Sequence, residues 1–164
     1  MKMRTRAAAG SLLFVLAFSA AFAQKAVILV RHAEKADSSK DPVLSETGQI
    51  RAKALAAFLA KTGISAIYCS EYQRTKLTAE PTAAALSLAI RVAPASDSAG
   101  LVERLRKDHA ADTVLVVGHS NTLPDIMKRF GHPVEESIAD DDYGNIFVLI
   151  PQEGKPPVLM RLRY

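Results

Sequence analysis

The chain of 164 residues is 49% hydrophobic and 23% charged, a composition that excludes a disordered or fibrous protein and fits one globular domain. Its formal net charge is +4, but Lys2, Arg4 and Arg6 contribute three of the positive charges. Without them Lys+Arg falls from 21 to 18 against 17 acidic residues, so the remaining net charge is near +1 and gives no support to nucleic-acid binding.

The N-terminus predicts a signal peptide, residues 1–23. An apolar run from Ser11 to Phe22 follows the basic residues and ends in an A-x-A cleavage motif at Ala23. The alternatives are a retained membrane anchor or a buried helix, but the run is shorter than the roughly 20 residues of a spanning helix. We therefore expect cleavage, export to the periplasm or the medium, and no stable membrane insertion of the mature chain, residues 24–164.

Cys69 is the only cysteine, so the mature chain of 141 residues (164 minus 23) has no internal disulfide. A chain of that length can bury a sufficient hydrophobic core. We interpret Cys69 as a small buried side chain at a strand end rather than as a reactive thiol.

The mature chain alternates between strand and helix patterns. The aliphatic run 26–30 predicts a strand buried on both faces, and 45–61 predicts a helix that begins at Ser45 and buries Ile50, Ala54, Ala57 and Phe58. Further strands are expected at 64–69, 89–93, 113–117, 145–150 and 158–163, and further helices at 72–86, 99–109 and 123–130. Pro81 should bend or divide the helix 72–86. This alternation predicts a three-layer α/β/α fold with a mainly parallel sheet.

Polar side chains follow three of these strands at their carboxyl ends. Arg31 and His32 follow the first strand, Arg74 follows the strand 64–69 within one loop, and His119 follows the strand 113–117. Ligands of such sheets bind just beyond the carboxyl ends of the strands. We therefore expect these four side chains to converge on one site.

Two histidines and two arginines suit phosphoryl transfer. A neutral imidazole is a competent nucleophile towards phosphorus, and nearby positive charge keeps it neutral. Guanidinium groups match the oxygens of the transferring group in geometry and charge. Such a site needs neither a metal nor another cofactor, and the histidine spacings of metallohydrolases and the G-x-S-x-G motif of serine hydrolases are absent from the sequence.

These residues lie in four motifs that resemble those of the histidine phosphatase superfamily, also called phosphoglycerate mutase-like. The family has Arg-His-Gly after a strand; here "VRHAEK" (30–35) has Ala33 in place of the glycine, as in a subgroup of small bacterial phosphohistidine-phosphatase-like members. The other motifs are "LSETGQIRAKAL" (44–55), "YCSEYQRTKLTAEP" (68–81) and "VLVVGHSNTLP" (114–124). Together they span nearly the whole mature chain.

The resemblance assigns roles by position. It implies that His32 is the phosphorylated nucleophile and that Arg31, Arg74 and His119 complete the phosphate pocket. Many members have an acidic general acid after the third strand, where Asp97 is the first candidate and Glu103 the second. Neither lies in a recognisable acid motif.

Other polar residues have two interpretations. Glu34 either contacts the substrate or is exposed in a loop, and Asn121 either caps the next helix or presents its amide to a phosphate. His109 and His132 are expected at the surface near helix ends, and the run 140–142 is expected to be a solvated turn.

The resemblance implies an exported, metal-independent phosphatase of the histidine acid phosphatase type. It would hydrolyse small phosphomonoesters or phosphoramidates through a phosphohistidine at His32. A mutase is disfavoured, because the mutases of this family carry longer inserts that enclose the substrate. The alternative from another class is a non-catalytic phospho-ligand-binding protein that captures phosphate in the same pocket but lacks the acid needed for turnover.

Overall fold

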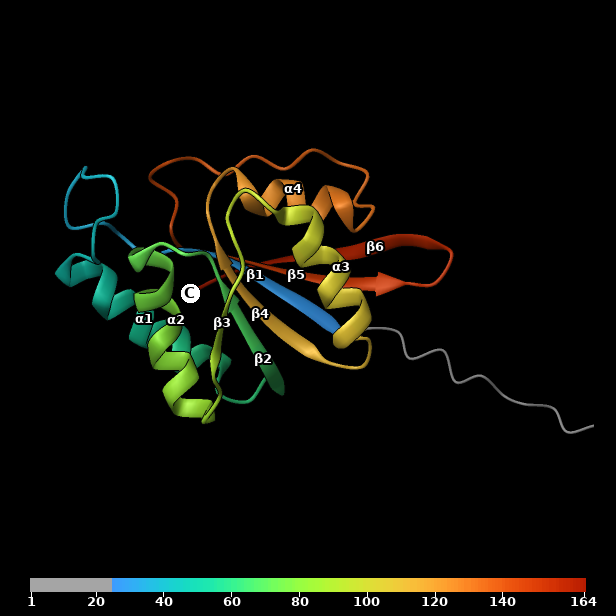
Figure 1. The fold of residues 1–164 in the computed structure, drawn as a ribbon, viewed down its shortest axis with the longest axis horizontal. Helices are drawn as coiled ribbons and strands as arrows, with labels where there is room; N and C mark the ends of the chain where they lie inside the picture. The colour runs from blue at the N-terminus through green and yellow to red at the C-terminus, as the bar shows by residue number, and fades with distance from the viewer. Residues whose placement is uncertain (1–24) are drawn as a thin grey trace, which may run out of the picture.

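The computed structural model describes residues 25–164, which form a central sheet between two layers of helices (Figure 1). The strands are β1 (Ala26–Arg31), β2 (Ile64–Cys69), β3 (Ile90–Val92), β4 (Thr113–Gly118), β5 (Asn145–Gln152) and β6 (Lys155–Arg163). The helices are α1 (Glu46–Leu59), α2 (Gln73–Leu86), α3 (Ser98–Asp108) and α4 (Thr122–Arg129). The predicted signal peptide, 1–23, lies outside the described residues.

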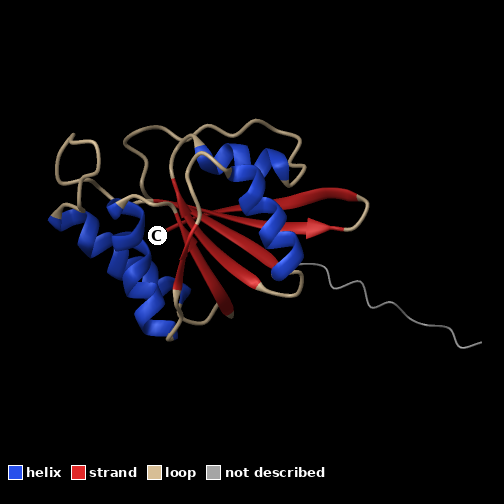
Figure 2. Cartoon of the chain, in the orientation of Figure 1, coloured by secondary structure: helices blue, strands red, loops and turns tan. Residues whose placement is uncertain are grey.

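The six strands have the order β3-β2-β4-β1-β5-β6. The first four strands of the chain pair in parallel, and β5 and β6 extend the sheet antiparallel from β1. Helices α1 and α2 lie on one side of the sheet and α3 and α4 on the other (Figure 2). The predicted three-layer α/β fold with a mainly parallel sheet is therefore confirmed.

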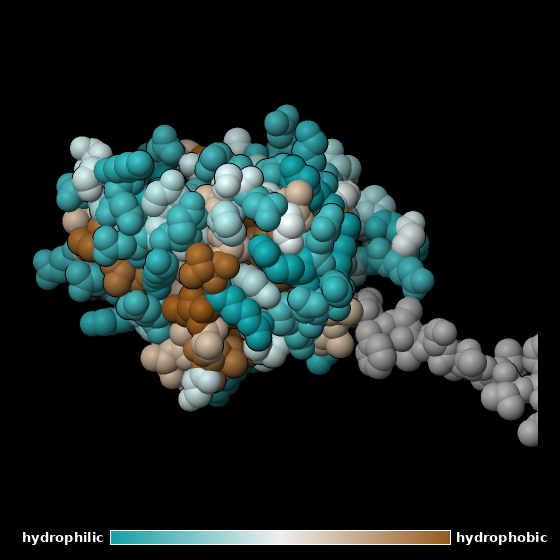
Figure 3. Space-filling view, in the orientation of Figure 1, coloured by the Kyte–Doolittle hydropathy of each residue, from teal (hydrophilic) through white to brown (hydrophobic). Residues whose placement is uncertain are grey.

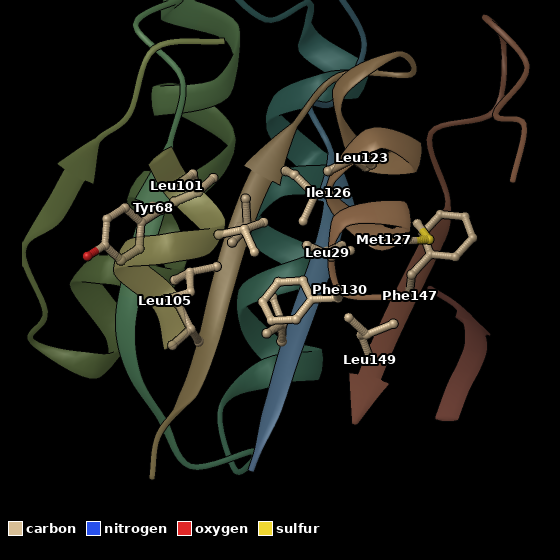
Figure 4. Close-up of a cluster of buried hydrophobic side chains, with 14 of the residues drawn as sticks. Leu29, Tyr68, Leu101, Leu105, Leu123, Ile126, Met127, Phe130, Phe147 and Leu149 are labelled. Carbon is tan, nitrogen blue, oxygen red and sulfur yellow. The ribbon is translucent and has the colours of Figure 1, made fainter. Parts of the chain in front are cut away.

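Strand β1 is buried on both faces. Val27 and Leu29 belong to the hydrophobic cluster beneath α3 and α4, which Figure 4 shows, whereas Ile28 and Val30 belong to the cluster beneath α1 and α2. Burial of each such side chain contributes about 1.5–3 kcal/mol. Packing on both faces explains why the sequence of this strand is continuously aliphatic, and it holds the carboxyl end of the strand in place.

The buried face of α1 differs from the predicted one. All four residues predicted to be buried are exposed, with Ile50 at 63% and Phe58 at 46%. The helix instead buries Ala52, Leu55, Ala56 and Leu59. Both sets have helical spacing, because α1 carries apolar residues around most of its circumference. Packing against α2 and the sheet selects the second set.

The loop after β1 is held by α1. Ser45 caps the helix as predicted, with its hydroxyl accepting the N–H of Gly48 at 3.1 Å, and its own N–H donates to the carbonyl of Glu34 at 2.9 Å. A Cβ at Gly48 would overlap the carbonyl oxygen of Glu34. Only glycine therefore allows α1 to approach the loop this closely.

Helix α2 runs from Gln73 to Leu86 with Pro81 inside it. The expected division at Pro81 does not occur. Proline lacks only one backbone donor, and the helix packs along its length against α1 and the sheet, so the missing hydrogen bond is tolerated.

Cys69 is 2% exposed and lies in the cluster beneath α1 and α2, which confirms its interpretation as a buried side chain. Burial raises the pKa of its thiol to about 11. The thiol is therefore protonated at neutral pH and unreactive.

The two histidines expected at the surface are largely buried. His109 does follow the end of α3, but it is 7% exposed, and its Nδ1 donates to Asp112 at 2.6 Å. His132 lies after α4 with its side chain 11% exposed. Both expectations are wrong because the turns that carry these residues fold back onto the core.

Hydrophilic residues cover most of the face shown in Figure 3, with smaller hydrophobic areas between them. Within residues 25–164, the helices are too short or too polar to cross a membrane.

Candidate active site

The pairing of β1 with β4 brings the two strand-end histidines together. Its register aligns Arg31 with Gly118, and the backbone N–H of His32 extends the ladder by donating to the carbonyl of Gly118 at 2.9 Å. His32 and His119 are therefore neighbours across the two strands, with ring centroids 5.3 Å apart. Figure 1 shows the carboxyl ends of these strands beneath the loops that follow them.

A cavity of about 420 Å³ opens at this end of the sheet. Five predicted site residues line it: Arg31, His32, Arg74, His119 and Asn121. The cavity thus collects side chains from the ends of β1 and β4, from the start of α2 and from the start of α4. This is the convergence that the order of the strands predicts.

The tautomer of His32 is determined by its backbone contact. Nδ1 lies 2.8 Å from the carbonyl oxygen of Ala33, which can only accept a hydrogen bond, so Nδ1 carries the proton. In the neutral ring Nε2 then has the free lone pair. The N–H of Ala33 donates in turn to the hydroxyl of Thr78 in α2, at 2.9 Å, which holds this turn in place.

His119 is oriented by two hydroxyl groups. The Thr75 hydroxyl donates to the carbonyl of Tyr72 at 2.8 Å, so at its 2.8 Å contact with Ser70 it must accept. The Ser70 hydroxyl therefore donates its proton to Thr75. It can only accept at its 2.9 Å contact with Nε2 of His119, so Nε2 carries a proton and donates. Nδ1 of His119 makes no hydrogen bond to any other described residue, so it is available to a ligand.

Both histidines are held neutral. Burial, with smaller contributions from His119, Arg31 and Arg74, lowers the pKa of His32 to about 4, against the opposing effect of the bond to Ala33. Burial and the same two arginines lower the pKa of His119 to about 4. An anion bound between these groups would reverse the charge effect and favour a proton on Nδ1 of His119.

Each arginine is stacked on a tyrosine. The guanidinium of Arg31 lies 4.5 Å from the ring centroid of Tyr143 and donates to the carbonyl of Ala139 at 2.7 Å. The guanidinium of Arg74 lies 4.2 Å from the ring of Tyr72. Stacking holds the planar groups in place beside the cavity that they line, where they can donate to an oxyanion.

Helix α4 begins at the cavity. Asn121 is its N-cap residue, and its side chain makes no capping hydrogen bond. The Thr122 hydroxyl instead accepts the N–H of His119 at 2.9 Å, which ties the second histidine to the helix. The first amides of α4 and the amide of Asn121 are therefore placed at a position that favours an anion.

Two predicted site residues do not line the cavity. Glu34 forms an ion pair with Arg51 at 2.7 Å, and the hydrogen bonds from Arg51 outweigh partial burial and lower the pKa of Glu34. Asp97 caps α3, with its carboxylate accepting the N–H of Gly100 at 2.8 Å. The second candidate acid, Glu103, is exposed on the same helix. The carboxylates of Glu34 and Asp97 therefore have structural partners outside the cavity: Glu34 is paired with Arg51, and Asp97 caps α3.

Several residues at the site were missed by the sequence analysis. Ser70 and Tyr72 lie within recognised motifs, but neither residue type pointed to a role there. Lys35, which was expected either to contact the substrate or to be exposed in a loop, lines the cavity. Tyr143 and Asp140 come from the long loop before β5, of which the run 140–142 was expected to be a solvated turn. Asp140 lines the cavity, and this turn is therefore part of the site.

No three His, Cys, Asp or Glu side chains within residues 25–164 form a group that could hold a metal ion. The positive groups of the cavity are Arg31, Arg74 and Lys35.

The fold and cavity define an α/β protein with a cationic pocket at the carboxyl edge of its sheet, and residues 27–97 match the model of the histidine phosphatase superfamily (branch 1). Over these residues the chain is similar to the histidine phosphatase superfamily. A search of curated proteins found no match.

Solved structures share the fold. The protein histidine phosphatase SixA, complexed with tungstate, aligns with a TM-score of 0.68 and 19% identity over 84% of this chain and 96% of its own. A mycobacterial glucosyl-3-phosphoglycerate phosphatase aligns with a TM-score of 0.67 and 16% identity over 85% of this chain and 98% of its own. An Escherichia coli protein provisionally named an alpha-ribazole-5'-P phosphatase aligns with a TM-score of 0.71 and 16% identity over 85% of this chain and 96% of its own.

The lowered pKa values predict a loss of stability in acid. Unfolding returns His32 and His119 to the ordinary histidine pKa near 6.5, so the unfolded chain binds more protons between about pH 6.5 and 4. The free energy of unfolding should fall as the pH falls through this window. In His32→Gln the loss between pH about 7 and about 4.5 should be smaller by roughly 2 kcal/mol. Urea unfolding at both pH values measures the difference, and an equal loss in both proteins would contradict it.

Proposed function

We propose that the mature protein is a metal-independent phosphatase that hydrolyses phosphomonoesters or phosphoramidates through a phosphohistidine at His32. The observation that carries the proposal is the state of His32: a buried neutral imidazole with its proton on Nδ1 and its lone pair on Nε2, in a cavity with two arginines. This arrangement suits a nucleophile towards phosphorus.

In the first step Nε2 of His32 attacks phosphorus, and the bond from phosphorus to the leaving group breaks. Arg31 and Arg74 donate to the phosphoryl oxygens, and His119, protonated on Nδ1 once the anion is bound, donates as well. Each preorganised donor of this kind contributes about 3 kcal/mol of transition-state stabilisation. The bond between Nδ1 and Ala33 favours the positive charge that develops on the ring.

In the second step water attacks the phosphohistidine. The new bond from oxygen to phosphorus replaces the bond to Nε2, inorganic phosphate leaves, and His32 returns to the neutral state. The same donors stabilise both transition states, because the phosphoryl oxygens do not change their place between the steps.

The fold neighbours support this proposal through the anions that they bind. SixA was determined with tungstate, and the mycobacterial phosphatase with inorganic phosphate and with VO3. The name of SixA, a protein histidine phosphatase, supports phosphoramidates as a substrate class. The charges of Arg31 and Arg74 support metal independence, because they can supply the electrostatic stabilisation that a divalent ion supplies in other phosphatases.

Substitution of the nucleophile tests the proposal directly. The purified mature protein should hydrolyse an aryl phosphate in the presence of EDTA, and His32→Ala should lower kcat by roughly 10³-fold or more. His132→Ala, a histidine outside this cavity, is the matched control and should retain activity.

The covalent intermediate gives the second measurement. Protein quenched during turnover should carry a phosphate that is stable in base and released in acid, as a phosphoramidate bond is, and His32→Ala should carry none. Tight binding of phosphate without turnover would overturn the phosphatase in favour of a phospho-ligand-binding protein.

We further propose that the protein is exported. The proposal rests on the sequence of residues 1–23, with Lys2, Arg4 and Arg6 before an apolar run and a small-residue cleavage motif. Expression of the full chain in a bacterial host should give a periplasmic or secreted protein whose N-terminal residue is Gln24. Arginine at Ala23 should block the cleavage. A cytoplasmic protein that retains residues 1–23 would contradict the proposal.

A further inference from the structure

The cavity has one carboxylate among the residues that line it, that of Asp140. Asp140 lies in the loop between α4 and β5, and its side chain is 95% exposed at the mouth of the cavity. Its Oδ1 accepts from the hydroxyl of Ser120 at 3.3 Å and from Nη2 of Arg31 at 3.5 Å. The carboxylate therefore contacts two residues that line the same cavity.

The other carboxylates near the site have structural partners. Glu71 accepts the N–H of Ala95 at 2.8 Å. Asp41 accepts the N–H of Gln73 at 2.8 Å, at the start of α2, and lies 3.8 Å from Arg74. As described above, Glu34 is bound to Arg51 and Asp97 caps α3. None of these four lines the cavity.

Asp140 lies on the side of the cavity where the leaving group of the first step is expected. His32 and His119 are less than a tenth exposed, whereas the Asp140 side chain is 95% exposed, so we take the histidines to lie at the inner end of the cavity and Asp140 at its open end. A nucleophile at the inner end requires the leaving group to lie towards the open end, since the two are roughly in line across phosphorus. Asp140 is the acidic side chain that lines the cavity at that open end.

On the basis of the proposed phosphatase activity, we propose that Asp140 is the proton donor to the leaving group. As Nε2 of His32 forms its bond to phosphorus, the bond from phosphorus to the ester oxygen breaks and the Asp140 carboxyl gives its proton to that oxygen, which leaves as an alcohol. In the second step the Asp140 carboxylate takes a proton from water as the water oxygen attacks phosphorus and the bond to His32 breaks. The carboxyl is then ready for the next cycle.

A series of substrates with different leaving groups tests the assignment with Asp140→Asn. For alkyl phosphates, whose leaving group must be protonated, kcat/KM should fall by about 10²–10⁴-fold. For nitrophenyl phosphate, whose leaving group departs as a stable anion, the fall should be about tenfold or less. Retained activity on the nitrophenyl ester also shows that the variant is folded. Asp141→Asn, the exposed neighbour outside the cavity, is the matched control and should behave as the unaltered protein.

A different pattern would overturn the assignment. An equal fall for every substrate would show that Asp140 acts only by positioning Arg31, and no fall for alkyl phosphates would show that it has no part in the reaction. Failure of the proposed function is a separate result, because it would appear as an unaltered protein that turns over no substrate or as full activity in His32→Ala. Either of those outcomes would overturn this inference as well.

Discussion

The site depends on the parallel pairing of β1 with β4. Because Arg31 lies opposite Gly118 and the ladder continues to the N–H of His32, the residue after each strand is a histidine facing the same cavity. A shift of one residue in either strand would turn its histidine towards the opposite face of the sheet. Such a shift is prevented by burial on both faces of β1, since every aliphatic side chain would have to exchange one hydrophobic cluster for the other. The hydrophobic core therefore determines the catalytic geometry.

The second constraint is the balance between burial and charge. Removing His32 and His119 from water disfavours their protonated forms, and the nearby guanidinium groups act in the same direction. The histidines are neutral, so the positive charge of the cavity comes from Arg31, Arg74 and Lys35. An anion can therefore enter a cavity that already holds both a free nucleophilic lone pair and fixed donors. The tyrosine rings and the hydroxyl groups of Ser70 and Thr122 keep these groups in position.

The sequence predicts the parts of this structure that depend on local pattern. Aliphatic runs locate the strands, and a parallel sheet brings their polar ends together, which is why Arg31, His32, Arg74 and His119 could be selected without coordinates. The buried face of α1 could not be predicted, because two faces of that helix are equally apolar and only packing distinguishes them. The choice of Asp97 shows the same limit. An aspartate before a helix is equally suited to capping and to catalysis, and the fold uses it as a cap. Asp140 reaches the cavity through a long loop, whose path no periodicity describes.

A crystal structure of the mature protein with vanadate would test the central claim most directly. Vanadate adopts the geometry of a phosphoryl group in transfer, so it reports which atom attacks and which groups stabilise the oxygens. We expect a bond between vanadium and Nε2 of His32, with the vanadate oxygens accepting hydrogen bonds from Arg31, Arg74 and Nδ1 of His119. Vanadium bonded to His119, or vanadate bound outside this cavity while His32 keeps an empty Nε2, would contradict it.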